Sequence, residues 1–457
     1  MMIGAGVSRW TMLHLGAAVV ALLFALALLG VGYADPIGGL RAPQTLIVVH
    51  LVTIGWLSVM MLGALYQFVP VITSTPLYSQ RLPLLSFVAL VAGLAAMVVG
   101  FLALGGATIV HVACLPVGGG LVIVGLALGA ANIAATLWRA RPLGLPARFV
   151  ACGLGFLLFA GLVGLGFALA FALLDPPAWL VGLLADGLMI HVLGGLGGWV
   201  TLTAMGVSYR LLSMFMLAPE EPRWISHAAL YLTAGGLLLF VGAGLAAALM
   251  QRPVGAFETP GGALALLGAA LYLVDIRHLY RVRARRKLEL NSIAAGAALA
   301  LFACVLIASV GAAAFGALDR FGPALGYLFV FGWLSGLGLS QLYKIVPFLT
   351  WLEVFGKRMG KGPVPRVQDL VNERRAAPWF GLYFTATLGA TGAMVGTSAG
   401  AFQLAAVVQL IAALAIAVEL WRAHRPDPNA APKPIAPGGG RPYAANLPPS
   451  RNSTHGA

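Results

Sequence analysis

The sequence predicts an all-α membrane bundle of about twelve transmembrane helices, arranged as three repeated arcs of four helices. Three observations predict this fold. Apolar residues make up 60% of the 457 residues and charged residues only 9%, whereas soluble domains are roughly 25% charged. The apolar residues fall into long runs with few interruptions. One such run is written three times at an interval of roughly 140 residues, and self-similarity at a long interval indicates an architectural repeat.

The repeated stretch centres on a Gly-Trp pair whose tryptophans are Trp56, Trp199 and Trp333. Each tryptophan is followed by a small residue, then by a tyrosine and a polar residue at fixed spacing; these are Gly63, Gly206 and Ser340, then Tyr66, Tyr209 and Tyr343, then Gln67, Arg210 and Lys344. The small residue lies about two turns after the tryptophan, on the same helical face. Each copy is therefore expected to present a notch where a neighbouring helix can approach closely.

Apolar runs of about 20 residues match the thickness of a bilayer. We expect twelve spans, near 11–33, 44–72, 82–105, 107–137, 147–174, 185–217, 226–250, 260–281, 291–318, 322–352, 378–399 and 401–421. The three copies are then spans two, six and ten, which places the arcs at roughly 1–140, 141–285 and 286–425. The first run is longer than a signal-peptide core and is expected to be an uncleaved helix. Residues 426–457 are rich in Pro and Gly and are expected to form a disordered cytoplasmic tail.

The basic residues indicate topology. A formal charge of +14 first suggests a nucleic-acid partner, but the arginines and lysines gather in the loops after spans four, eight and ten. The loops after odd-numbered spans carry few charges. Cytoplasmic loops are enriched in basic residues, so we expect both termini to be cytoplasmic. The partner is then the lipid bilayer of a bacterial-type inner membrane, with no nucleic acid.

Three histidines are the candidate ligands. His50, His191 and His111 lie at about one depth, near the outer ends of spans two, six and four. An imidazole buried in hydrocarbon is costly unless it is paired or ligating, and neutral imidazole is a common ligand of metals and haem iron. The alternative is a histidine at the interface that is satisfied by water or a carbonyl, and this alternative is favoured for His111. The distances of His50 and His191 from their tryptophans differ by two residues, about 200° around a helix. We therefore expect the two side chains to point different ways and to serve two sites, or only one of them to be a ligand.

Other polar residues support simpler interpretations. Asp186 lies about one turn before His191, where it is either a carboxylate that orients the imidazole or, as we favour, a charge at a loop end. The three repeated tyrosines and their polar neighbours favour an aromatic belt with snorkelling cations over a proton path. The sequence has no Gly-rich phosphate loop, no Ser-His-Asp order and no paired membrane carboxylates. These absences argue against a hydrolase and against a carboxylate-driven ion pump.

Three motifs carry a family resemblance. They are His-Leu-x-Thr-x-Gly-Trp from His50 to Trp56, Gly-Ala-Leu-Tyr-Gln-x-x-Pro-Val from Gly63 to Val71, and Gly-Val-Ser-Tyr-Arg-Leu-x-x-Met-Phe from Gly206 to Phe215. With the expected topology, the chain resembles the haem–copper oxidase subunit I superfamily, which includes nitric oxide reductases and, more distantly, NnrS-type proteins. The resemblance implies that His50 binds a low-spin haem and that His191 binds copper. It also implies haem b and copper as cofactors and respiratory-chain or cytochrome subunits as partners.

The chain also departs from that family. Family oxidases place a His-x-His pair in span ten and a His-His pair in span seven, whereas here span ten has no histidine and span seven has His227 alone, at its inner end. A complete binuclear centre is therefore not predicted, no catalytic residue is assigned, and enzymatic activity is left open. The leading hypothesis is a haem- or copper-binding membrane protein of respiratory or nitrogen-oxide metabolism. The alternatives are a structural or partner subunit without a cofactor and, less favoured because mid-membrane charge is scarce, a small-solute or metal transporter.

Overall fold

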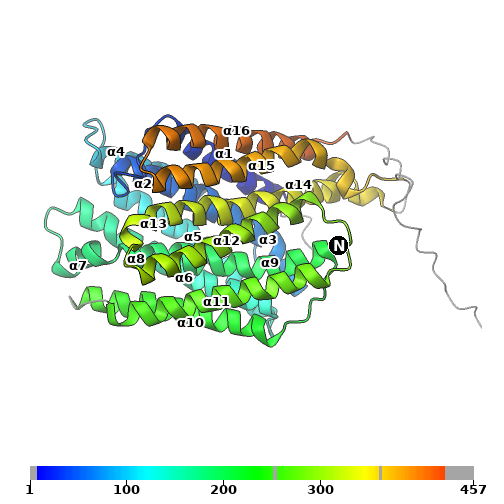
Figure 1. Ribbon diagram of the computed structural model, residues 1–457, viewed down its shortest axis with the longest axis horizontal. Helices are drawn as coiled ribbons and strands as arrows, with labels where there is room; N and C mark the ends of the chain where they lie inside the picture. The colour runs from blue at the N-terminus through cyan, green and yellow to red at the C-terminus, as the bar shows by residue number, and fades with distance from the viewer. Residues whose placement is uncertain (1–7, 251–254, 360–362, 428–457) are drawn as a thin grey trace, which may run out of the picture.

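The chain folds into a bundle of long helices that lie roughly parallel to one another (Figure 1). A computed structural model describes residues 8–250, 255–359 and 363–427, and these residues form helices joined by loops, with no strand among them. The predicted tail at 426–457 falls outside the described residues except for its first two positions. Eleven helical stretches of the described chain are long and apolar enough to cross a membrane. The remaining predicted span is α15, which packs along α16.

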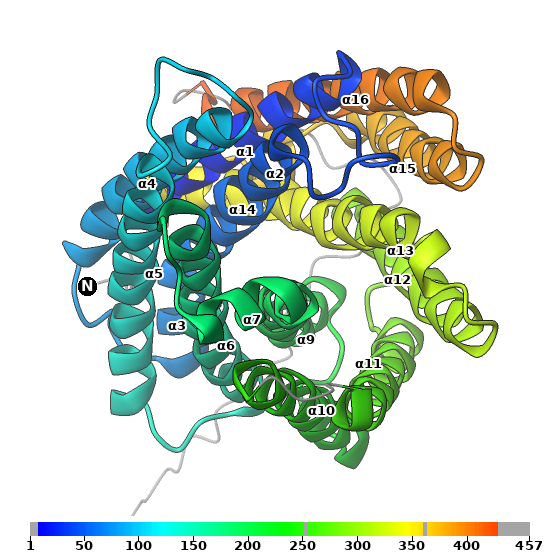
Figure 2. The ribbon, with the colours of Figure 1, turned by 90° about the vertical axis from the view of Figure 1, so that its left-hand side faces the viewer.

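Each arc contains a first helix, a helix that carries the repeat and an outer hairpin. The first helices are α1 (Ser8–Gly30), α6 (Leu145–Ala172) and α12 (Leu290–Ala314); the hairpins are α4 (Leu82–Leu104) with α5 (Cys114–Arg139), α10 (Trp224–Leu249) with α11 (Gly255–Val282), and α15 (Glu373–Val395) with α16 (Ala399–His424). The view along the helices shows the hairpins on the outside of the bundle (Figure 2). This arrangement confirms the predicted class, a membrane bundle of three four-helix arcs.

The repeat-bearing helices contain an unexpected feature. In each of them a π-helical segment replaces the middle of the predicted continuous α-helix, and the three segments coincide with the three Gly-Trp copies. The order is α2 (Pro43–His50), η1 (Leu51–Ser58) and α3 (Val59–Thr73) in the first arc; α7 (Ala178–Asp186), α8 (Leu188–Val192), η2 (Leu193–Thr201) and α9 (Leu202–Met216) in the second; and α13 (Leu318–Tyr327), η3 (Leu328–Ser335) and α14 (Gly336–Val354) in the third, followed by the short helices η4 (Gly356–Arg358) and η5 (Val367–Leu370). π-Helical turns are rare and occur often at functional sites.

Hydrogen bonds of the three tryptophans link the arcs at the centre of the bundle. All three indole rings are buried. The Nε1 of Trp199 donates to the Oγ of Ser58 at 3.1 Å, and the Nε1 of Trp56 donates to the Oγ of Ser335 at 2.9 Å. The second arc is thereby tied to the first and the first to the third. The link between the third and second arcs is missing, because Trp333 Nε1 has no partner and its ring stacks instead on Phe302, with the ring centroids 3.6 Å apart.

The predicted notches are present in the first two arcs. A Cβ added to Gly63 would lie 2.5 Å from the Cβ of His14 on α1, and a Cβ added to Gly206 would lie 2.5 Å from the Cβ of Phe149 on α6. In both arcs the first helix therefore packs directly against the backbone of the repeat-bearing helix. The third copy has Ser340 instead, whose hydroxyl donates to the carbonyl of Leu337 in its own helix.

Candidate cofactor site

His50 is held at the boundary between α2 and η1. Its Nδ1 lies 2.7 Å from the carbonyl oxygen of Leu46, one turn earlier. A carbonyl can only accept, so Nδ1 carries the proton and Nε2 has an unshared electron pair. The imidazole is half-buried and packs against the ring of Phe101 on α4, with the centroids 5.0 Å apart. This is the tautomer and the support expected of a histidine ligand.

His191 is held in the same way at the boundary between α8 and η2. Its Nδ1 donates to the carbonyl oxygen of Ala160 on α6 at 3.0 Å, which leaves Nε2 unprotonated. Gly164, one turn further along α6, gives the ring room, because a Cβ there would lie 2.9 Å from His191 Cε1. Phe167 covers the ring edge, at a centroid distance of 5.5 Å. The Ala160 carbonyl therefore orients the imidazole, the role considered from the sequence for Asp186. Asp186 is the last residue of α7.

The structure places His50 and His191 on neighbouring repeat-bearing helices of the first and second arcs. His50 immediately precedes η1, His191 lies two residues before η2, and η1 packs against η2. The His50 ring packs against Phe101 on α4, whereas the His191 ring packs against Ala160 and Phe167 on α6, so the expectation that the two side chains point different ways stays a prediction.

His111 is placed differently. It lies in the exposed loop before α5, and its Nδ1 accepts the backbone N–H of Ala113 at 3.0 Å. That hydrogen bond uses the Nδ1 lone pair and places the proton on Nε2. Within the described residues, no group of three or more His, Cys, Asp or Glu side chains could hold a metal ion. His111 therefore does not join the other two histidines, and its metal role remains a prediction that this geometry does not support.

The third arc has a tyrosine where the first arc has His50. Tyr327 stands six residues before Trp333, as His50 stands six before Trp56. The Tyr327 hydroxyl donates to Gln409 Oε1, and Gln409 Nε2 donates to the Thr387 hydroxyl at 2.9 Å. These hydrogen bonds satisfy the polar groups at this position. The third arc thus contributes a closed polar network, whereas the first and second arcs each contribute a histidine.

Sequence reasoning missed two buried titratable residues. His14 on α1 is fully buried; its Nδ1 donates to the Trp10 carbonyl at 2.7 Å, and its Nε2 has no partner. Asp275 on α11 is also buried and accepts hydrogen bonds from Tyr209, Ser226 and Arg223. An ionisable residue inside an apolar span is itself a signal of function or pairing. His14 lies within the first apolar run and Asp275 within the eighth, and both carried that signal.

The three repeated tyrosines do not form an aromatic belt. Their side chains are at most 8% exposed, so they pack inside the bundle and do not face lipid headgroups. Their polar neighbours have protein partners: Arg210 forms an ion pair with Glu220 and Lys344 forms one with Glu289. The interface assignment is therefore wrong for the tyrosines. It failed because a position near the membrane surface was read without knowing which helical face packs inward.

Comparisons with known proteins agree with this architecture at the level of the fold. No protein-family model matches the chain, and no curated protein matches it in sequence. A solved structure described as a "heme-copper terminal oxidase dimer" matches 93% of this chain and 84% of its own, with a TM-score of 0.60 and 14% sequence identity. The chain has the fold of a haem–copper oxidase. At this identity the match establishes the fold alone, so the ligand roles of His50 and His191 remain predictions.

Proposed function

We propose that this oxidase-like membrane protein binds haem between its first and second arcs, with His50 and His191 as the protein ligands. One observation carries the proposal: on neighbouring helices of the first and second arcs, both imidazoles donate Nδ1–H to a backbone carbonyl, which leaves both Nε2 atoms unprotonated. Two neutral imidazoles from different repeats, each fixed by a second partner, form a donor set suited to an iron centre.

The donor set fits haem better than copper alone. A haem iron already has four porphyrin nitrogen ligands, so one or two protein imidazoles complete it. A metal ion held by protein alone usually has at least three protein ligands, and the described residues contain no such group. Copper bound by two imidazoles is the second candidate. The iron and copper content of the purified protein distinguishes haem from copper.

The residues around the pair have defined tasks in this proposal. The carbonyls of Leu46 and Ala160 fix the tautomer of each ligand, Gly164 provides room beside the His191 ring, and Phe101 and Phe167 cover the rings. Haem, when bound, supplies one-electron redox chemistry. The ligands expected in spans seven and ten of the oxidase family are missing from the sequence. We therefore propose an electron-carrying, sensing or assembly role in respiratory or nitrogen-oxide metabolism, with cytochrome or other respiratory subunits as partners.

The direct test is the optical spectrum and metal content of the purified full chain, expressed with sufficient haem. We expect absorption bands of a six-coordinate, low-spin haem and about one iron per chain. His50→Ala and His191→Ala should each lower the haem content or convert the spectrum to the five-coordinate form. His278→Ala is the matched control, because this half-buried histidine lies on α11, away from the pair. Stoichiometric copper without haem would favour the copper alternative.

A structural role without a cofactor is the second candidate function. The tryptophan links already tie the first arc to both other arcs through protein groups alone. This candidate predicts a colourless, metal-free protein that is folded, and His50→Ala and His191→Ala variants that assemble normally. Such a product would overturn the haem proposal and leave the scaffold role.

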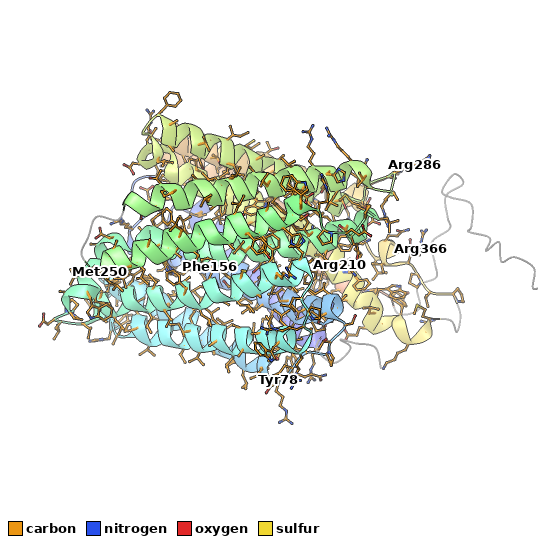
Figure 3. All side chains as sticks on the ribbon, turned by 90° about the horizontal axis from the view of Figure 1, so that it is seen from below. Tyr78, Phe156, Arg210, Met250, Arg286 and Arg366 are labelled. Atoms are coloured by element: carbon orange, nitrogen blue, oxygen red, sulfur yellow. The ribbon has the colours of Figure 1, made fainter. Side chains whose placement is uncertain are left out.

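We further propose a bacterial inner-membrane location with both termini in the cytoplasm. The start of the described chain and the loops rich in arginine lie at the same end of the bundle in Figure 1, and Figure 3 shows Arg210, Arg286 and Arg366 at that end with Met250 at the other. Positive charge at one end supports this orientation.

A further inference from the structure

A polar groove opens at the arginine-rich end of the bundle, outside the histidine site. It has a volume of about 540 Å³ and lies where the loop between α11 and α12 meets the segment that leads into α15. Figure 3 places Arg286 and Arg366 at this end. Four cations and three carboxylates line the groove: Arg285, Lys287, Arg366 and Arg374, with Glu289, Asp369 and Glu373.

The three carboxylates of the groove already have partners. Glu289 pairs with Arg285 and with Lys344 from α14, and Asp369 pairs with Arg366. Glu373 accepts the backbone N–H of Leu290 at 3.0 Å.

Two cations of the groove have no such partner. Among the residues that the structure describes, neither Lys287 nor Arg374 forms an ion pair. Within the same described residues Glu373 forms no ion pair either, so the four cations and three carboxylates that line the groove leave one net positive charge.

Two helices begin at this groove. α12 starts at Leu290 and α15 starts at Glu373, and residues at both starts line the groove. The N-terminal end of a helix carries partial positive charge and exposes backbone N–H groups. The helix starts add partial positive charge to that of Lys287 and Arg374, and Glu289 and Glu373, which stand at the same starts, offset part of it.

The second, independent observation is a small chamber that adjoins the groove. A chamber of about 10 Å³ shares Glu289, Gln368, Val371 and Glu373 with it, which is room for about one water molecule or one ligand oxygen. Asn291 and Tyr343 also line this chamber; both are buried, and Asn291 Nδ2 and the Tyr343 hydroxyl have no hydrogen-bond partner. Buried donors of this kind nearly always have a hydrogen-bond acceptor in native proteins. We therefore expect an acceptor atom from outside the chain to occupy the chamber.

We propose that the groove binds a phosphate group. Phosphate is anionic and presents several acceptor oxygens, which matches two unpaired cations, two helix starts and two buried donors. The same chemistry is carried by the headgroup of an anionic phospholipid and by a soluble phosphate ester. Basic pockets between membrane helices bind anionic lipid headgroups, and a soluble ester reaches the same groove from the aqueous side.

The test is thermal unfolding of the full chain, purified in detergent at fixed ionic strength, with four probes added separately. The probes are dihexanoyl phosphatidylglycerol, the zwitterionic dihexanoyl phosphatidylcholine, glycerol 3-phosphate and inorganic phosphate. We expect saturable stabilisation by an anionic probe, because a ligand bound only by the folded state raises stability. Stabilisation by phosphatidylglycerol alone identifies a lipid, and equal stabilisation by glycerol 3-phosphate identifies a soluble ester.

Two pairs of substitutions locate the site. Lys287→Gln with Arg374→Gln should weaken binding about tenfold or more, since each removes a charge-assisted contact. Asn291→Leu with Tyr343→Phe removes the two buried donors and should lose the ligand effect while unfolding no earlier without ligand. The control pair, Arg41→Gln with Arg320→Gln, neutralises two exposed cations outside the groove, one in a loop and one in the first turn of α13. No stabilisation by any anionic probe, or full stabilisation of both groove variants, would overturn the proposal.

Discussion

At the scale of single residues, the candidate site depends on the space that Gly164 leaves beside His191. A methyl group at this position would lie 2.9 Å from the ring carbon Cε1, which is inside ordinary van der Waals contact. Gly164→Ala should therefore turn the imidazole away from the Ala160 carbonyl. We expect haem content or the low-spin spectrum to fall as in His191→Ala, measured by absorbance per mole of protein.

Gly155→Ala is the control for this prediction. It introduces the same change on the same helix, where an added Cβ meets no atom within 4 Å. The control should keep the spectrum and be as stable as the parent, because alanine is the better helix former by up to about 1 kcal/mol. Equal spectra for both variants would show that the His191 ring does not need this space.

The indole hydrogen bonds give a second prediction at the residue scale. Trp199→Phe and Trp333→Phe remove the same indole N–H and shrink the side chain alike, yet only Trp199 donates to a partner, Ser58. Trp199→Phe should therefore lower the free energy of unfolding by about 1 kcal/mol more than Trp333→Phe does. Chemical unfolding followed by circular dichroism measures this difference. A larger loss in Trp333→Phe would mean that its stacking on Phe302 outweighs the hydrogen bond.

At the scale of elements, the notch between α1 and α3 controls how closely two helices pack. Gly63→Ala places a Cβ 2.5 Å from the Cβ of His14 and close to the Thr11 carbonyl, so α1 must move outward. We expect a loss of about 1–3 kcal/mol, as for other overpacked cores, seen as a lower midpoint of thermal unfolding. Gly16→Ala, which meets nothing within 4 Å on α1, should leave the midpoint unchanged or raise it.

The π-helical segments show what the sequence could and could not predict at this scale. The Gly-Trp copies, their spacing and the Gly63 and Gly206 notches were readable as patterns in one dimension. The π turns were not, because they depend on tertiary contacts. Ser58 and Thr201 donate to carbonyls five residues earlier, those of Thr53 and Leu196, and this spacing suits a π turn. The Ser58 hydroxyl also accepts a hydrogen bond from Trp199 of another arc, which is such a tertiary contact.

At the scale of the whole molecule, the placement of His50 and His191 on neighbouring helices follows from the ring of arcs. The depth of both residues could be predicted from the spans that contain them. The direction of each ring could not, since it depends on the neighbouring helix that holds it, α4 for His50 and α6 for His191. The burial of Tyr66 and His14 was missed for a related reason: depth along a helix does not tell which face packs inward.

Topology gives the last prediction, which concerns the whole bundle. In a variant with Cys114, Cys152 and Cys304 replaced by alanine, a single cysteine at Ile109 or at Arg286 reports on opposite ends, and both native side chains are exposed. The arginine-rich end should be cytoplasmic. An impermeant maleimide should therefore label Ile109→Cys and not Arg286→Cys from the periplasmic side. In inverted membrane vesicles the labelling should be reversed. Both positions belong to the same folded bundle, so labelling of Arg286→Cys from the periplasm would invert the assignment of both ends. It would also move the two histidines to the cytoplasmic side of the membrane.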